Sequence, residues 1–223
     1  MENKENIAKN PQQKNAETTS NQNLLKKELF RDFCKSMNDE MKFKFWIKTL
    51  LSSYQTIPEI IKTIDKIIEI QASTVSFSSD IFNGSKTVEG QVEKVIDLTE
   101  RKSSLLNIYI MTKELLKNLT SGDYGYIEKN FIYNWSIEEI SKYFGISTRT
   151  SYRKIDKAID EIYHVALSKN WSTRFIESQI SREQWLKGRF VKIIHDYFKN
   201  SSLSNSTKVY DVKSRVDELE KAL

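Results

Sequence analysis

Hydrogen-bond donors are concentrated in one short stretch of the chain, directly after a glycine and an isoleucine. Hydroxyl, guanidinium and ammonium groups recur there, carried by Ser147, Thr148, Arg149, Thr150, Tyr152, Arg153 and Lys157. Side chains of these types bind phosphate oxygens and the edges of bases in DNA. The stretch predicts a nucleic-acid contact if it forms an exposed helix.

The preceding residues predict such a helix and a turn before it. Ser136 and Glu139 have the spacing of a capping box, in which each residue satisfies a backbone N–H of the other. Gly145 stands where the chain must reverse, and glycine adopts positive φ there at little cost. Ser147 can cap a second helix. The run 135–157 therefore predicts a helix-turn-helix, whose second helix lies in the major groove of DNA.

The run 119–162 resembles region four of bacterial sigma factors, and resembles more closely the sigma-like activators of phage late genes of the RinA and ArpU type. One part of the match precedes the turn: Tyr126, Ile127 and Phe131. The other part spans the two helices: Glu139, Ile140, Ser141, Phe144, Ile146, Ser147, Arg149, Thr150 and Arg153. The resemblance implies an all-α fold with a DNA-binding unit in the C-terminal half. It also implies that the seven donors after Ile146 face DNA, and we add Lys142 as a phosphate contact.

One position departs from the family pattern. Three residues after Ser151 the family has an aliphatic side chain that packs inward, whereas this chain has Lys154. The apolar positions Ile155 and Ile159 still define one helical face. The rotation of the second helix is therefore left open, and with it the question of which residue among 152–154 faces the groove.

Composition favours helices and a basic DNA-binding half. The 223 residues include only six glycines and two prolines, and the formal charge is +5. Residues 141–199 contain twelve Lys or Arg against six Asp or Glu, so the positive charge gathers around the predicted motif. We expect a multi-helix, all-α protein.

The hydrophobic pattern predicts six successive parts. They are a disordered tail (1–22), an N-terminal helical module (23–72), a linker (73–87), the helix-turn-helix domain (88–167), a helical extension (168–199), and a linker with a heptad-like terminal helix (200–223). In the module, a helix from Leu24 has one apolar face, which either Phe45 or Trp46 continues; its members are Leu25, Leu29, Phe33, Met37 and Met41. A hairpin at Asn83–Gly84 and a break over 164–172 are further expectations. The terminal heptads predict either a homo-oligomer or a docked amphipathic tail.

Nothing in the sequence predicts catalysis or a cofactor. Cys34 is the single cysteine and His164 and His195 are the only histidines, so no metal-ligand spacing exists. No nucleophile elbow or dinucleotide-binding turn is present. We expect a non-enzymatic protein without metal or cofactor. The lone cysteine, the absence of a secretion signal and the lack of a membrane-spanning run favour the cytoplasm and no membrane contact.

Two functions remain in view. The first is a DNA-binding, sigma-like transcription regulator whose partners are double-stranded DNA and RNA polymerase. In it, Phe43, Phe45 and Trp46 are the only candidates for a second, promoter-melting sigma region. The alternative is a helical protein-interaction module without DNA contact. An exposed positive stripe formed by Arg149, Arg153 and Lys157 favours the first function, whereas ion pairs of these residues with the acids at 156, 160 and 161 favour the second.

Overall fold

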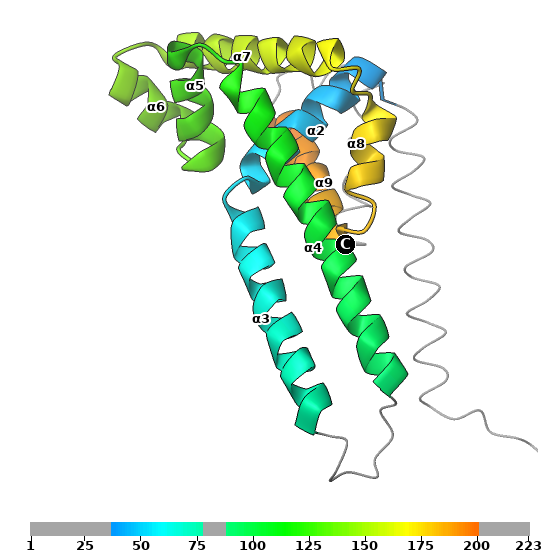
Figure 1. The fold of residues 1–223 in the computed structure, drawn as a ribbon. Helices are drawn as coiled ribbons and strands as arrows, with labels where there is room; N and C mark the ends of the chain where they lie inside the picture. The colour runs from blue at the N-terminus through cyan, green and yellow to red at the C-terminus, as the bar shows by residue number, and fades with distance from the viewer. Residues whose placement is uncertain (1–36, 78–87, 201–223) are drawn as a thin grey trace, which may run out of the picture. The chain divides into compact units, whose positions relative to one another are not determined.

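The computed structural model describes residues 37–77 and 88–200, and all regular structure in these ranges is helical (Figure 1). The all-α prediction is confirmed. The elements in chain order are α2 (Asp39–Ser53), α3 (Thr56–Phe77), α4 (Val88–Lys117), α5 (Ser121–Ile127), the π-helix η1 (Glu128–Ile132), α6 (Ile137–Phe144), α7 (Thr148–Ser168), α8 (Thr173–Gln179) and α9 (Gln184–Asn200).

The chain divides into two compact units. Residues 39–190 form the larger one, and the terminal segments 1–38 and 191–223 form the other, so that α9 contributes to both. All contacts described below lie within residues 39–190. The predicted tail, the Asn83–Gly84 hairpin and the terminal heptads lie outside the described residues.

Helix α2 is the central helix of the larger unit. It is buried on most of its circumference, through Phe43, Phe45, Trp46, Ile47, Leu50 and Leu51. The indole ring of Trp46 stacks on Phe190, with the ring centroids 3.8 Å apart. A helix that is apolar nearly all round is stable only inside a protein. The three aromatic residues proposed for promoter melting are therefore core residues, and that expectation is wrong in this fold.

The start of α2 also differs from the sequence prediction. The expected helix from Leu24 runs through residue 41 without a break, but Met37 and Asn38 are not helical and α2 begins at Asp39. Met41 was expected on the buried face, yet 39% of its surface is exposed. Because α2 begins at Asp39 and does not continue a helix from Leu24, a different set of side chains shares its buried face.

Helices α3 and α4 lie side by side as a long antiparallel hairpin (Figure 1). Pro58 lies in the first turn of α3, where its missing N–H costs no hydrogen bond. The rings of Tyr54 and Tyr109 stack at 4.8 Å beside the start of α3. Only the part of α3 near the central helix is fully covered: Ile64 is buried, whereas Ile70 is 61% exposed.

The predicted break after α7 is displaced. We expected it over 164–172, but α7 continues to Ser168 and the chain turns at Asn170, which has φ 59°. Ser172 then caps the short helix α8, because its hydroxyl accepts the backbone N–H of Phe175 at 3.2 Å. Helix α8 was missed because seven residues are too few to show a helical period.

Candidate nucleic-acid interface

Helix α6 begins with the capping box that its sequence predicts. The backbone N–H of Ser136 donates to the carboxylate of Glu139 at 2.8 Å, and the N–H of Glu139 donates to the Ser136 hydroxyl at 3.2 Å. The first of these bonds lowers the pKa of Glu139, because it stabilises the charged form. The entry of α6 is thus set by residues close in sequence.

Gly145 reverses the chain between α6 and α7. It has φ 65° and ψ 33°, the left-handed conformation that L-residues rarely adopt. The N–H of Ile146 donates to the carbonyl of Ser141 at 3.0 Å, which satisfies a carbonyl at the end of α6. Ser147 then caps α7 by accepting the N–H of Thr150 at 3.1 Å. Two helices therefore meet across a three-residue connection.

Replacing Gly145 with alanine should destabilise the chain by about 1–2 kcal/mol, because a Cβ in this conformation approaches the following carbonyl. No atom lies within 4 Å of the added Cβ, so the loss reports backbone strain alone. Gly188, inside α9, is the matched control: its Cβ also meets nothing within 4 Å, and Gly188→Ala should stabilise by about 0.5–1 kcal/mol. Urea denaturation measures both. Equal effects of the two changes would contradict the turn assignment.

The buried residues of α7 show how this helix is rotated about its own axis, which the sequence left open. Ser151 is fully buried, and its hydroxyl lies 2.9 Å from the hydroxyl of Ser141 on α6. The remaining inward residues are apolar: Ile155, Ala158, Ile159, Ile162 and Ala166. Lys154 is exposed. A hydroxyl pair therefore lies between the two helices, and residues 152–154 all lie outside the core.

Arg149 and Arg153 lie on the opposite side of α7. Both are exposed, and a spacing of four residues places them on one face of the helix. Neither forms an ion pair or side-chain hydrogen bond with any residue in the described parts of the chain. Tyr152, beside them, is 53% exposed. The first two turns of α7 thus present two guanidinium groups to solvent.

The acidic residues of α7 are neutralised by lysines rather than by these arginines. Asp156 lies 3.8 Å from Lys48, and Asp160 lies 2.7 Å from Lys44, both on α2. Burial lowers the pKa of Lys48, and Asp156 acts against this effect. Two of the three acids that could have masked Arg149 and Arg153 are therefore held by lysines of another helix.

Lys157 differs from the other predicted DNA contacts because it forms ion pairs within the chain. Its ammonium group lies 3.0 Å from Glu161 and 3.7 Å from Asp123. The hydrogen bond that Lys157 donates to the Glu161 carboxylate raises the pKa of Lys157. The charge of Lys157 is therefore partly compensated, and its contribution to a positive surface is smaller than the sequence suggested.

The other predicted DNA contacts are exposed, but some of them already form hydrogen bonds within the chain. Lys142 on α6 and Thr148 at the start of α7 are exposed, and Lys142 has no ion pair among the described residues. The hydroxyls of Ser147 and Thr150 lie 2.8 Å apart and bond to each other. Among the described residues, five of the eight predicted contacts form no side-chain hydrogen bond or ion pair: Lys142, Thr148, Arg149, Tyr152 and Arg153.

A cluster of aromatic rings around Lys129 borders α6. The ammonium group lies 4.8 Å from the ring centroids of Tyr133 and Trp135 and 5.1 Å from that of Tyr143. Tyr133 is 49% exposed. Sequence reasoning missed Lys129 and Tyr143. The four-residue spacing of Lys129 and Tyr133 was the one local signal.

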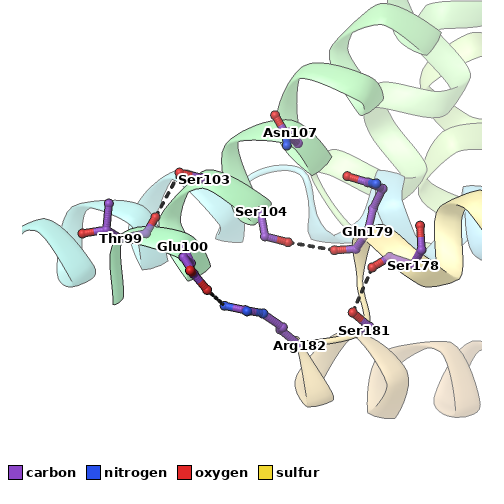
Figure 2. Close-up of a pocket in the computed structure, with 9 residues that line it drawn as sticks. All are labelled: Thr99, Glu100, Ser103, Ser104, Asn107, Ser178, Gln179, Ser181 and Arg182. Carbon is purple, nitrogen blue, oxygen red and sulfur yellow. Dashed lines mark hydrogen bonds and ion pairs between the residues drawn. The ribbon is translucent and has the colours of Figure 1, made fainter. Parts of the chain in front are cut away.

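A cavity of about 360 Å³ lies between α4 and the segment 178–182 (Figure 2). Its lining is polar and largely bonded to itself: Ser104 donates to the carbonyl of Gln179 at 2.8 Å, and Arg182 lies 2.6 Å from Glu100. Among the described residues, no group of three or more His, Cys, Asp or Glu side chains could hold a metal. Neither observation indicates a reaction centre.

Within residues 37–77 and 88–200, no helix has the length and apolar character needed to cross a membrane. No family model, curated protein or solved structure matches the chain.

Proposed function

We propose that the chain is a DNA-binding transcription regulator that acts at promoters with bacterial RNA polymerase, in the manner of a sigma-like activator. The observation that carries this proposal is the state of Arg149 and Arg153. Both are exposed, share one face near the start of a capped helix, and have no ionic partner among the described residues. Unpaired guanidinium groups at this position suit phosphate and guanine recognition.

In the proposed complex, the first two turns of α7 enter the major groove. One arginine makes a bidentate contact to the O6 and N7 atoms of guanine, and the other binds a phosphate. Lys142 and Lys157 bind flanking phosphates. Because 60% of the Lys157 side chain is exposed, its ion pairs are weak and can be exchanged for a phosphate at little cost.

Burial of the aromatic residues on α2 favours an activator over a complete sigma factor. Phe43, Phe45 and Trp46 are at most 3% exposed and cannot stack on unpaired bases in this fold. The lysines next to them are paired as well, since Lys42 lies 2.8 Å from Glu177 and Lys44 lies 2.7 Å from Asp160. We therefore propose that promoter melting is left to another protein.

Selection of random DNA duplexes on the full-length chain tests the proposal. We expect a defined sequence to be enriched, and its affinity to fall with salt at a slope of about −3 for roughly three phosphate contacts. RNA polymerase should co-purify with the chain. Absence of any duplex binding at low salt would contradict DNA recognition, and would favour the interaction module considered from the sequence.

A further inference from the structure

One acidic residue lies on the same face of α7 as Arg149 and Arg153. Arg149, Arg153 and Asp156 follow one another at steps of four and three residues, which brings all three to one side of the helix. The Asp156 side chain is 66% exposed. It comes directly after the two turns that enter the groove in the proposed complex. An acid at this place needs an explanation, because an uncompensated carboxylate close to DNA phosphates opposes binding.

Lys48 of α2 compensates the charge of Asp156. Helix α2 packs against α7, and the ammonium group of Lys48 lies 3.8 Å from Oδ1 of Asp156. Only 18% of the Lys48 side chain is exposed, and its ammonium group also lies 5.8 Å from the ring centroid of the buried Phe45. The positive charge is therefore held in place by the core. Because the two charges offset each other, Asp156 repels phosphates only weakly.

The ion pair leaves hydrogen-bonding capacity on Asp156. A carboxylate has two oxygens with about four lone-pair sites. Lys48 approaches Oδ1, at a distance longer than a normal hydrogen bond, and no other described residue bonds to Asp156. Asp160, one turn further along α7, is held more closely, because Lys44 lies 2.7 Å from it. Asp156 is thus the acid on this side of α7 that is better able to accept a hydrogen bond from outside the chain.

Cytosine is the base whose major-groove edge suits a carboxylate. It presents its N4 amino group as a donor, whereas guanine presents two acceptors and thymine presents an acceptor and a methyl group. Adenine also has an amino group, but the N7 acceptor beside it repels a carboxylate oxygen. A carboxylate next to guanine-binding arginines therefore favours a cytosine close to the guanine.

We propose that Asp156 is a specificity-determining residue, which accepts a hydrogen bond from the N4 amino group of a cytosine in the duplex that α7 reads. The inference rests on the proposed function and names the class of duplex selected. At ~1.5 Å per residue, Asp156 lies roughly 4.5 Å beyond Arg153 and roughly 10.5 Å beyond Arg149 along the helix axis. Base pairs are ~3.4 Å apart, so the cytosine lies about one to three base pairs from the guanine that one arginine binds.

Selection of random duplexes on the full-length chain and its variants, followed by affinity measurements, tests the assignment. The wild-type chain should enrich a motif with a cytosine at this spacing, and exchange of that base should weaken binding at least about fivefold. Asp156→Ala should bind the four versions of the motif that differ at this position with nearly equal affinity. Asp156→Asn should shift the preference toward adenine, because a carboxamide bonds to both N6 and N7 of adenine.

Asp160→Ala is the matched control. It removes the same charge from an acid that also pairs with a lysine of α2 and whose side chain is 52% exposed, but one turn further along α7. We expect it to leave the enriched motif unchanged. Asp156→Asn keeps an oxygen opposite Lys48, so it tests the base contact independently of any loss of stability in Asp156→Ala. Thermal unfolding shows whether each variant is folded.

Four results would overturn the inference. They are a wild-type motif without a cytosine at this spacing, a motif that both changes at Asp156 leave unaltered, tighter binding of all four duplexes by Asp156→Ala with the cytosine preference retained, and loss of the same preference in Asp160→Ala. The third result would mean that Asp156 only repels phosphates. Absence of any enrichment by the wild-type chain contradicts the proposed function as well, whereas enrichment that does not depend on Asp156 contradicts this inference alone.

Discussion

Replacing Arg149 and Arg153 together with alanine should weaken binding to the selected duplex by about 2–6 kcal/mol, roughly 30-fold to 10⁴-fold. The estimate takes about 1–3 kcal/mol for each good contact to a base. The fold should persist, because both side chains are exposed and neither bonds to a described residue. Fluorescence anisotropy at fixed salt measures the affinity, and thermal unfolding checks that the variant is folded.

Lys62 and Lys66 provide the matched control for charge. They are also exposed, are four residues apart on α3, and form no ion pair with another described residue. Lys62→Ala/Lys66→Ala removes the same net charge, so it should change affinity only through long-range attraction, by about a few-fold. The arginine variant should also lose about 0.9 of the salt slope if one arginine binds a phosphate. Equal losses in both double variants would reduce the proposal to non-specific attraction.

Local chemistry in the sequence was sufficient to predict the turn. Ser136 and Glu139 form the expected capping box, and Gly145 has the expected positive φ. These features depend on residues within a few positions of one another, so no knowledge of the tertiary fold is needed.

Features that depend on distant residues could not be predicted. Lys44 and Asp160 are more than one hundred positions apart, and nothing in either segment shows that they pair. That pairing decides whether Asp160 can mask the arginines of α7. The inward position of Ser151 has the same origin, because its partner Ser141 lies on another helix. Whether the predicted DNA contacts are exposed therefore depends on the tertiary fold, because distant residues decide it.

The aromatic residues on α2 show how a sequence pattern can mislead. Phe43, Phe45 and Trp46 alternate with lysines, which in a nucleic-acid-binding protein suggests stacking beside phosphate contacts. In the fold, the rings are buried and the lysines reach acids at the surface. Long lysine side chains permit both arrangements, because their stems pack on apolar surface while the charge stays in solvent. Pattern alone does not separate the two.

The second large effect concerns a buried carboxylate that joins α4 to the start of α9. Glu183 is 1% exposed and accepts two hydrogen bonds from Arg101, at 2.8 and 3.1 Å, and one from the indole N–H of Trp185 at 2.6 Å. Arg101→Met should destabilise the chain by about 3–5 kcal/mol, because it leaves a buried charge without its counter-ion. The change in the urea midpoint at one fixed protein concentration measures the loss.

Removing the carboxylate should cost less than removing the guanidinium group. Arg101 keeps 38% of its side chain exposed, so it can be hydrated when Glu183 is replaced, and Glu183→Gln should cost about 1–3 kcal/mol. The double change Arg101→Met/Glu183→Leu should be more stable than Arg101→Met alone, since it leaves no unpaired buried charge. Lys102→Met, which breaks the more exposed pair with Asp65, should cost less than about 1 kcal/mol. If Arg101→Met costs no more than Lys102→Met, the link that Glu183 makes between α4 and the start of α9 is weaker than its geometry indicates.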